Sequence, residues 1–554
     1  MPEVDTLDTT FDLIVVGSGG AGLAGALTAA IDGAKVLVLE KASTIGGTTA
    51  VSGGGAWIPC NPHLGEVGQS DTPEEALAYL RACSGSVGDE SHLAALVDRG
   101  VEAIKFFEEK GGLHFRAWPT GGGTIDYKPW LPGAKHGGRT LSAPEFHLSD
   151  LGEWRDRLRL GANSRWVSDP LMYYEKKMHL QRPSKSAISR TGLENKSADP
   201  ITSVASGAAF IGQMLRSCLK LGVTILTDAP ADKLETEGGR VVGVSATYRG
   251  QAIRFAATHG VLVATGGFAH NERLKRLWLT RPLEYSCETP ECQGEGHLMG
   301  MDVGAMVSVG DAWWMPHVPM GEADGKIVAG GTREDRGLPG TLMVNSQGKR
   351  FMNEAVNYYD AGEAFGNKVG APERNFPGWY IFDQAALDRY ALVAWKIPES
   401  GRPSYLKVAD TLDGLALAMG VDSTALGETI RRFNEFARTG VDEDFGRGAN
   451  PWDVAWGDPE NKPNPCLGAL KTAPFYAIPI YSGALATRGG LCVNASAQVL
   501  SARTGEPIPG LYAAGNCSDG GAAGTYAGAG ATIGAGITFG YIAAKKIRDE
   551  IRAS

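Results

Sequence analysis

The first forty residues contain the pattern that most constrains the fold of this 554-residue chain. An apolar run, FDLIVVG (residues 11–17), leads into a glycine-rich turn with GxGxxG spacing, an alanine-rich segment and a second apolar run, AKVLVLE (residues 34–40). Continuous apolar runs of this length are typical of strands buried on both faces of a parallel sheet. The whole pattern predicts a β-α-β unit with a dinucleotide site at its first turn.

Each glycine of this turn has a physical role. Gly17 permits the tight turn, Gly19 lets a pyrophosphate approach the backbone, and Gly22 lets the helix pack on the strand. The positive end of the helix favours phosphate charge, and Glu40 at the end of the second strand can accept hydrogen bonds from an adenosine ribose. We also expect cofactor contacts from the neighbouring Gly20, Ala21 and Lys41.

A second glycine-rich segment favours FAD over a nicotinamide cofactor. The stretch KASTIGGTTAVSGGGAWIP (residues 41–59) follows the ribose carboxylate directly, so more ligand than an adenosine half passes here. The sequence also contains no second GxGxxG that would hold a nicotinamide cofactor. We therefore predict non-covalently bound FAD, whose ribityl chain and flavin contact Gly46, Gly47, Thr48, Thr49, Ser52, Gly53 and Gly54.

Strand signals return much later in the chain, at residues 222–250, 260–268 and 504–516. We expect an α/β fold with a Rossmann-like FAD-binding domain assembled from residues 1–290 and 481–554. Residues 291–480 are predicted to form an inserted α+β catalytic domain, with the substrate in the cleft between the two, because ligand sites favour domain interfaces. Further cofactor contacts are expected from Ala231, Thr265, Gly266, Gly515, Asn516, Ala531, Thr532 and Ile533.

Composition excludes several classes of function. The net charge of -9 gives a nucleic-acid partner no electrostatic support. The eight cysteines are scattered without a CxxC pair, which fits a reducing compartment and predicts no metal site. The polar start MPEVDTLDTT does not resemble a signal peptide, and no run reaches the ~18 apolar residues of a spanning helix. We predict a cytoplasmic protein.

One segment is basic although the protein is acidic. Residues 150–190, within a helical insertion of about 140–200, carry nine basic and five acidic side chains with aromatic residues between them. Two interpretations are open. The segment is either a helical excursion packed on the surface, or a lid or peripheral membrane contact that helps an apolar substrate to enter.

Together these motifs resemble the 3-ketosteroid dehydrogenases of the fumarate reductase/succinate dehydrogenase flavoprotein superfamily. The resemblance rests on GSGGAGL, VLEK, GGTTAVSGGG, ATGGF, GKRFMNE, GLYAAGN and TYAGAGATIG, and it covers nearly the whole chain. The FAD motifs are common to the superfamily. The element Tyr526-Ala-Gly-Ala-Gly530 is narrower and resembles the Tyr-x-x-x-Gly pair of the Δ1-dehydrogenases.

The resemblance implies a 1,2-dehydrogenation of a 3-ketosteroid. Tyr526 and the backbone N–H of Gly530 would bind the 3-keto oxygen. Tyr358 would remove a carbon-2 proton while carbon 1 gives hydride to flavin N5, and Tyr127 would hydrogen-bond that base. The implied substrate is an apolar cyclic ketone, and the implied electron acceptor is external, such as a quinone.

Two features leave the base assignment open. Tyr359 is adjacent to Tyr358, so the base is one of these two tyrosines, and Asn357 stands where we expect a proline before the base.

Single positions distinguish the alternative functions. A 3-ketosteroid Δ4-(5α/5β)-dehydrogenase would be expected to carry a Tyr-x-Ser element, but Gly528 stands at the serine position. A fumarate reductase-like enzyme would carry an arginine where Tyr526 stands, and it would act on another cyclic ketone or enone if it lacks that arginine. A flavin-binding protein without turnover would need no polar constellation. The sequence leaves the steroid class, the acceptor and the oligomeric state open.

Overall fold

A computed structural model describes residues 4, 7–118, 125–161, 164, 201–308, 310–323, 326–332, 334–366, 375–390, 392, 403–520 and 524–553. Its main sheet has the strand order β21-β22-β11-β1-β2-β8. The neighbours from β22 to β8 are all parallel, which confirms the predicted α/β class. These strands are β21 (Gln498–Leu500), β22 (Pro507–Ala513), β11 (Gln251–Val263), β1 (Thr10–Val16), β2 (Val36–Leu39) and β8 (Thr224–Leu226).

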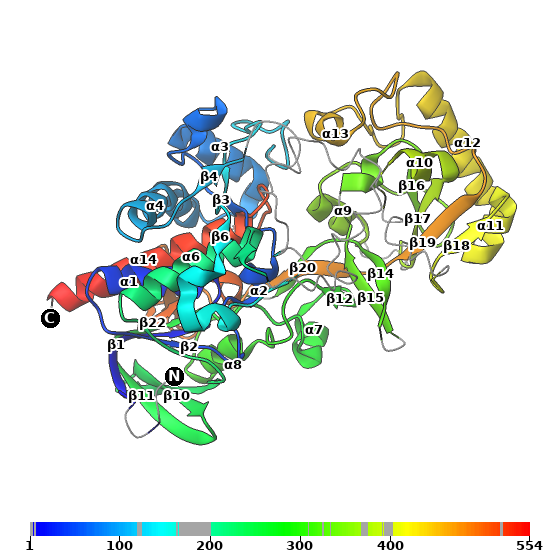
Figure 1. The fold of residues 1–554 in the computed structure, drawn as a ribbon. Helices are drawn as coiled ribbons and strands as arrows, with labels where there is room; N and C mark the ends of the chain where they lie inside the picture. Colours follow the sequence, from blue (N-terminus) through cyan, green and yellow to red (C-terminus); the bar gives the residue numbers. More distant parts are fainter. Residues whose placement is uncertain are drawn as a thin grey trace.

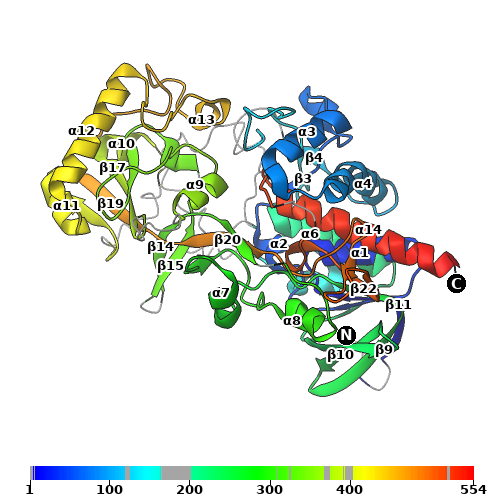
Figure 2. The same ribbon diagram turned by 180° about the vertical axis from the view of Figure 1, so that it is seen from behind.

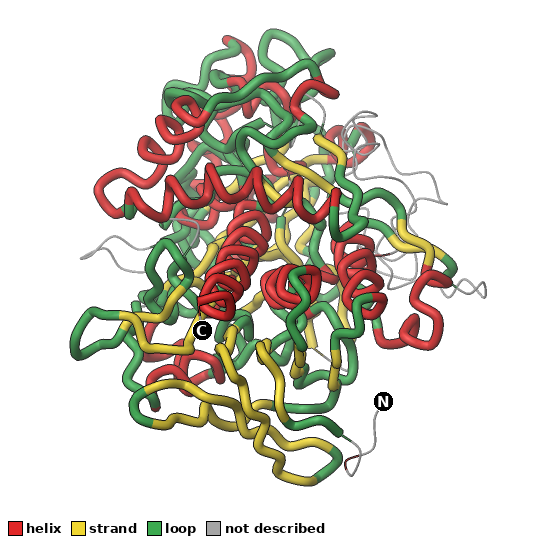
Figure 3. Tube along the Cα trace, turned by 90° about the vertical axis from the view of Figure 1, so that its left-hand side faces the viewer, coloured by secondary structure: helices red, strands yellow, loops and turns green. Residues whose placement is uncertain are grey.

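The long strand β11 joins the main sheet to an antiparallel extension. Its first part pairs with β10 (Arg240–Tyr248), which pairs in turn with β9 (Ala231–Glu237). The turn between β9 and β10 is the predicted Gly238-Gly239 pair, and both glycines have positive φ. Figure 3 shows these strands at the lower edge of the molecule, on the side of the sheet away from the helices.

Three helices cover the other face of the sheet: α1 (Gly20–Ile31), α6 (Ser206–Lys220) and α14 (Ala531–Ala553) (Figure 1). Alternate residues of β1 point to opposite faces of the sheet. Leu13 and Val15 pack in the core beneath the helices, whereas Ile14 and Val16 pack in the core on the β10 side. Helices α1 and α14 approach closely. A Cβ on Gly540 would lie 2.3 Å from the Ala21 carbonyl oxygen, so this contact requires glycine.

A second body has its own four-stranded antiparallel sheet, in the order β16-β17-β19-β18. Helix α12 (Ser423–Thr439) is the amphipathic stretch seen in the sequence, and it buries Leu426, Ile430 and Phe433 against this sheet. Figure 2 shows α11 (Leu412–Met419) and α12 at the end of the molecule remote from the main sheet. The strands are β16 (Thr341–Val344), β17 (Gly378–Asp383), β18 (Lys407–Ala409) and β19 (Phe475–Ile480).

A three-stranded sheet connects the two bodies. Strand β20 (Gly483–Arg488) pairs with β12 (Tyr285–Ser286) on one side and with β13 (Asp311–Trp314) on the other. Because β13 lies within residues 291–480 and β20 lies outside them, backbone hydrogen bonds cross the boundary that the sequence suggests. The division at residues 290 and 480 stays our proposal.

The remaining elements are short or flank the cleft. They are α2 (Gly47–Val51), β3 (Ala56–Trp57), α3 (Pro73–Ser84), α4 (Glu90–Glu109), β4 (Arg116–Ala117), β5 (Thr140–Ser142), β6 (Phe146–His147), β7 (Ser203–Val204), α7 (Glu272–Trp278), α8 (Glu295–Asp302), β14 (His317–Ala323), β15 (Lys326–Gly331), α9 (Tyr358–Ala364), α10 (Gln384–Arg389) and α13 (Pro451–Trp456).

The basic insertion lies mostly outside the described residues. Its first part, Leu148–Arg157, forms 3-10 turns. Among the described helices, none combines the length and the apolar character that crossing a membrane requires.

Candidate active site

One cavity of about 600 Å³ brings together residues from the two bodies. Most of the predicted cofactor residues line it: Gly17, Gly19, Gly20, Ala21, Glu40, Lys41, Gly47, Thr48, Thr49, Ser52, Gly53, Gly54, Ala231, Thr265, Gly266, Gly515, Asn516, Thr532 and Ile533. The four predicted substrate-side residues, Tyr127, Tyr358, Tyr526 and Gly530, line the same cavity. Segments from both ends of the chain therefore share one pocket.

Three predicted cofactor residues are not part of the cavity wall: Gly22, Gly46 and Ala531. They support it from behind. A Cβ on Gly22 would lie 2.0 Å from the Gly17 carbonyl oxygen, so this glycine lets the turn close. Gly46 adopts φ +119° and its N–H donates to Ser18 Oγ at 3.0 Å. The Ala531 N–H donates to the Gly528 carbonyl as α14 begins.

The first turn of α1 fits the phosphates of a dinucleotide. Gly19 occupies the N-cap position without a side-chain cap bond, and the first turn of α1 carries no acidic residue. No carboxylate in the first turn of α1 therefore neutralises the positive N-terminal end of the helix. The Gly20 N–H contacts Thr49 Oγ1 at 3.2 Å, which ties this turn to the second glycine-rich segment. Glu40 lines the cavity while its carboxylate also accepts from the N–H of Ser18 at 3.0 Å.

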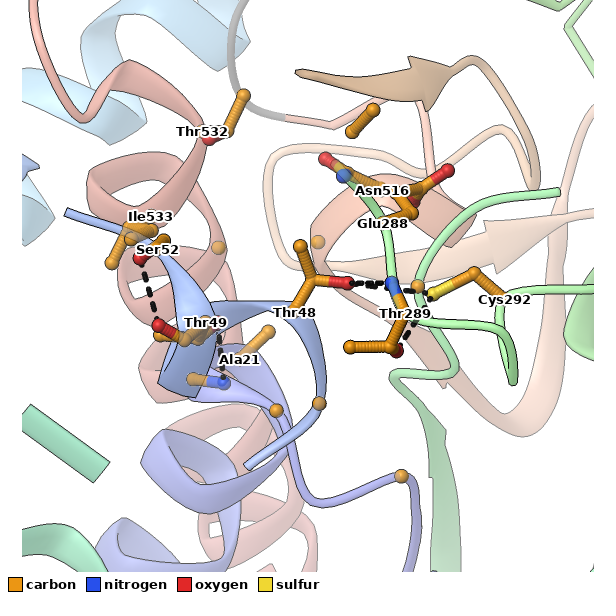
Figure 4. Close-up of a pocket in the computed structure, with 18 of the residues that line it drawn as sticks. Ala21, Thr48, Thr49, Ser52, Glu288, Thr289, Cys292, Asn516, Thr532 and Ile533 are labelled. Atoms are coloured by element: carbon orange, nitrogen blue, oxygen red, sulfur yellow. Dashed lines mark hydrogen bonds between the residues drawn. The ribbon is translucent and has the colours of Figure 1, made fainter. Parts of the chain in front are cut away.

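Several cavity residues come from a segment that the sequence patterns do not single out. Figure 4 shows Thr289 and Cys292 facing Thr48 across the pocket, where the Thr289 N–H donates to Thr48 Oγ1 at 3.1 Å. Glu288 lies beside them and is held by Thr487. The predicted domain boundary at residue 290 falls inside this segment, and no glycine motif marks it. The other unpredicted wall residues include Trp118, Arg159, Cys287, Glu291, Glu295, Met299, Met315, Gly331, Trp452, Leu485, Ala486 and Ala529.

The three predicted tyrosines form one cluster. The Tyr127 ring is stacked on that of Tyr526 at 5.6 Å between centroids, and Tyr358 meets each of them edge-on, at 5.3 Å and 5.6 Å. Tyr127 and Tyr526 are buried, and both are near enough to Tyr358 to raise its pKa. Trp452 closes the cluster with its ring 4.9 Å from that of Tyr127.

The cavity distinguishes the two adjacent tyrosines. Tyr358 lines it, whereas Tyr359 is not among the wall residues and packs against Trp313, with ring centroids 5.6 Å apart. Burial raises the pKa of Tyr358 well above its usual range, and the neighbouring tyrosines raise this pKa further. The phenol is therefore neutral at pH 7, and a proton-accepting Tyr358 requires alkaline conditions or help from a bound ligand.

Two loops hold the tyrosine cluster together. The backbone N–H of Tyr127 donates to the Ala527 carbonyl at 3.0 Å, which joins the loop of Tyr127 to the loop of Tyr526. The buried Tyr79 hydroxyl donates to the same carbonyl at 2.7 Å and accepts from the Lys128 N–H at 3.2 Å. The relative position of Tyr127 and Tyr526 is thus determined by a small hydrogen-bonded clamp.

Gly528 and Gly530 are both required by their surroundings. A Cβ on Gly528 would lie 2.5 Å from Trp57 Cδ1, and the Trp57 indole is fixed because its N–H donates to Asp126 at 2.9 Å. There is no room for the serine of a Tyr-x-Ser element unless Trp57 moves. Gly530 adopts φ +86°, and a Cβ there would lie 2.2 Å from the Gly55 carbonyl oxygen.

Asn357 is the N-cap of α9, the helix that begins at Tyr358. Its Oδ1 accepts from the N–H groups of Tyr359 and Asp360 at 3.1 and 3.0 Å. Its Nδ2 donates to the Tyr127 carbonyl at 3.2 Å and to Asp360 Oδ2 at 2.8 Å. A single buried side chain therefore positions the helix of Tyr358 and the backbone of Tyr127 together.

The chain is similar to known proteins over nearly its whole length. A family model described as FAD binding domain matches residues 12–533. The 4-oxocyclohexanecarboxylate 2-dehydrogenase of Sinomonas cyclohexanicum is 37% identical, and the match covers 98% of this chain and 94% of the relative. The 3-oxosteroid 1-dehydrogenase of Mycolicibacterium smegmatis is 36% identical, with 98% of each chain covered.

A solved structure shows the same overall fold. The crystal structure of 3-ketosteroid delta1-dehydrogenase from Sterolibacterium denitrificans, in complex with 1,4-androstadiene-3,17-dione, matches with a TM-score of 0.88 at 31% identity. The match covers 98% of this chain and 100% of that protein.

Proposed function

The chain belongs to the FAD binding domain family of flavoproteins, and we propose that it is a 3-oxosteroid 1-dehydrogenase, which introduces a double bond between carbons 1 and 2 of a 3-ketosteroid. The proposal extends to this chain the activity for which the Mycolicibacterium and Sterolibacterium relatives are named. When bound, FAD supplies the hydride acceptor of such a reaction.

The observation that carries the proposal is the apolar, aromatic character of the tyrosine end of the cavity. Its described wall includes Trp118, Tyr127, Tyr358, Trp452, Leu485, Ala486, Tyr526, Ala529, Gly530 and Cys287. Among the described wall residues, only Lys41 and Arg159 are basic. Lys41 is paired with Glu295, and Arg159 with Glu291 at 2.9 Å, beside the segments that hold the cofactor. A flat apolar ketone fits this wall better than a carboxylate does.

The chain's own groups then have distinct roles. The Tyr526 hydroxyl and the Gly530 N–H donate hydrogen bonds to the ketone oxygen, which stabilises the charge that develops there when the neighbouring carbon loses a proton. Tyr358 is the group that takes this proton, because it lines the cavity and contacts Tyr526. Tyr127 packs edge-on against the Tyr358 ring at 5.3 Å and helps to position it.

A substrate panel tests the proposal. The FAD-loaded protein is assayed with 4-androstene-3,17-dione and an artificial electron acceptor, and the position of the new double bond is determined by NMR. We expect the 1,4-dien-3-one. A product whose new double bond lies elsewhere, or a ketone that is not turned over and does not bleach FAD under anaerobic conditions, would contradict 1,2-dehydrogenation.

A second candidate substrate is a small cyclic ketone that carries a carboxylate. The comparable identity to the Sinomonas enzyme favours it, whereas the lack of a basic side chain at the described tyrosine end opposes it. The same panel therefore includes 4-oxocyclohexanecarboxylate. A higher kcat/KM for this acid than for the steroid would replace the steroid proposal.

Two finer features belong to the same proposal. We expect the external electron acceptor to be a quinone, which we would test by replacing the artificial acceptor with a soluble quinone. Peripheral membrane contact through residues 150–190 is the second, and vesicle co-sedimentation of the full chain tests it. A turnover rate that does not depend on the added quinone would exclude the quinone as acceptor. A protein that stays in the supernatant when the vesicles are sedimented would exclude the membrane contact.

A further inference from the structure

Cys287, a thiol in the cavity wall, and His317, an imidazole that contacts it from behind the wall, have no part in the proposed dehydrogenation. Cys287 follows β12 and lines the cavity, and its Sγ lies 3.5 Å from Nε2 of His317 at the start of β14. The Cys287 N–H donates to the Ala484 carbonyl at 3.0 Å, directly before Leu485 and Ala486 of the cavity wall, so the thiol lies at the tyrosine end of the pocket. The pair lies where a ketone bound by Tyr526 would be within its reach.

The hydrogen bonds of His317 determine which of its ring nitrogens is free of a proton. Nδ1 lies 2.9 Å from the Met315 carbonyl oxygen, which can only accept, so Nδ1 carries the proton. The lone pair of Nε2 then points to Cys287 Sγ. The ring is held in this orientation, because it is 1% exposed and a Cβ on Gly483 would lie 2.0 Å from Nδ1. Burial lowers the pKa of His317 to about 4, which keeps the imidazole neutral at pH 7 with a lone pair on Nε2.

A nucleophile, an adjacent base and a group that orients the base are the arrangement of an activated thiol. We propose that Cys287 and His317 form a covalent modification site for α,β-unsaturated ketones. His317 Nε2 takes the Sγ proton while Sγ bonds to the β-carbon, and the electron pair of the carbon–carbon double bond moves to the carbonyl oxygen. The proton then passes from the imidazole to the α-carbon, so the net change is addition of S–H across the double bond without any redox step.

The proposed product of this protein is itself such a ketone. The inference that the natural electrophile is the dienone product rests on the proposed function, whereas the reactivity of the pair does not. If both hold, the protein is slowly inactivated by product that stays in the cavity, at the thiol beside Tyr526.

Cys292 is a matched control within the same cavity. Its thiol also lines the pocket, but its Sγ contacts the hydroxyls of Thr48 at 3.6 Å and Thr289 at 3.8 Å, and neither hydroxyl is a base at neutral pH. Burial also raises the pKa of Cys292 to about 12. A difference in labelling between Cys287 and Cys292 therefore reports His317 together with the deeper burial of Cys292, and the His317 variant described below separates the two effects.

The experiment uses FAD-loaded protein, 2-cyclohexen-1-one as the probe and no electron acceptor. Intact-mass spectrometry counts the adducts, and fragmentation of the peptide that contains both thiols locates them. We expect one adduct per chain at Cys287, formed about tenfold or more faster than any adduct at Cys292. Cyclohexanone, which has no double bond, should slow the labelling because it occupies the same ketone site.

Two variants separate the roles of the pair. Cys287→Ala should lose the adduct, and His317→Gln should slow labelling about a hundredfold, because it removes the base. Flavin absorbance and the unfolding midpoint show whether each variant is folded. Should His317→Gln fail to fold, the ratio of labelling between the two thiols in the unmodified protein decides.

Three results would overturn the inference: equal labelling of the two thiols, labelling only at other cysteines, or no adduct while a thiol reagent still detects Cys287. Labelling without steroid turnover would contradict the proposed function alone. Steroid turnover with an unreactive Cys287 would contradict this inference alone.

Discussion

Replacing Asn357 separates two contributions that this residue makes to the tyrosine cluster. In Asn357→Ser the hydroxyl can still accept a hydrogen bond from the first turn of α9, but it is too short to reach the Tyr127 carbonyl. In Asn357→Ala both functions are lost. The two variants therefore distinguish capping of the helix from the connection between Tyr358 and Tyr127.

The expected magnitudes follow from the bonds that are lost. Loss of an N-cap costs about 1 kcal/mol of stability, and a buried carbonyl left without a donor costs about 1–3 kcal/mol. Asn357→Ala should thus lower the free energy of unfolding by about 2–4 kcal/mol, and Asn357→Ser by about 1–3 kcal/mol. A displacement of a catalytic group by about 1 Å reduces turnover on the order of 10²-fold, so kcat should fall by about 10- to 100-fold in both variants.

Urea unfolding measures the first quantity, and steady-state kinetics at saturating acceptor measure kcat and KM. We expect KM to change much less than kcat, because Asn357 is not a wall residue of the cavity. Asn271→Ala is the control, since Asn271 caps α7 by accepting from the Leu274 N–H at 3.0 Å and does not line the cavity. It should lose about 1 kcal/mol of stability with unchanged kcat. A normal kcat and a normal pH profile in the Asn357→Ser variant would refute the positioning role.

Further outcomes are expected at the same site. Tyr358→Phe should abolish turnover while FAD stays bound, as flavin absorbance would show; a fully active variant would exclude Tyr358 as the base. Because the pKa of Tyr358 is raised, kcat should increase about tenfold per pH unit through the alkaline range. Because the pKa of Tyr358 is higher in the folded than in the unfolded chain, the stability that the neutral phenol contributes is complete below about pH 10 and is lost at higher pH. Activity should therefore pass through a maximum. A flat activity profile from pH 6 to about 10 would contradict this expectation. Gly528→Ser should not produce Δ4 chemistry and should cost about 1–3 kcal/mol of stability through its clash with Trp57, measured by thermal unfolding and product analysis; a Δ4 product would show that Trp57 can move.

Much of the cofactor half of the site can be predicted because its signals are local. The GxGxxG turn, the strand before it and Glu40 lie close together in the chain, and Gly17 and Gly22 are each required by a close backbone contact. The α/β class follows from the same unit. Gly22 and Gly46 do not line the cavity, and a glycine required by packing has the same sequence signature as a glycine required by a ligand, so their cofactor contacts stay a prediction.

The substrate half depends on contacts that no local pattern encodes. Trp452 meets Tyr127 only because β20 and the second body bring α13 against the first body. Cys287 and Cys292 belong to a segment without glycine motif, helix periodicity or charge pattern. Asn357 does carry a local signal, because an asparagine followed three residues later by an acid marks the start of a helix. In the sequence, however, this position is noticed first because it lacks the proline that the resemblance leads us to expect.

The close fit of α14 into α1 has a consequence for synthesis on the ribosome. The turn that receives phosphate is among the first residues to emerge, yet the helix that packs on it and the tyrosine beside it belong to the last part of the chain. Chains grow at about 5–20 residues per second, so the N-terminal unit waits tens of seconds for its final partner. Cofactor binding that needs both helices therefore waits until α14 has been synthesised, and a chain truncated before α14 should not retain the yellow colour of FAD.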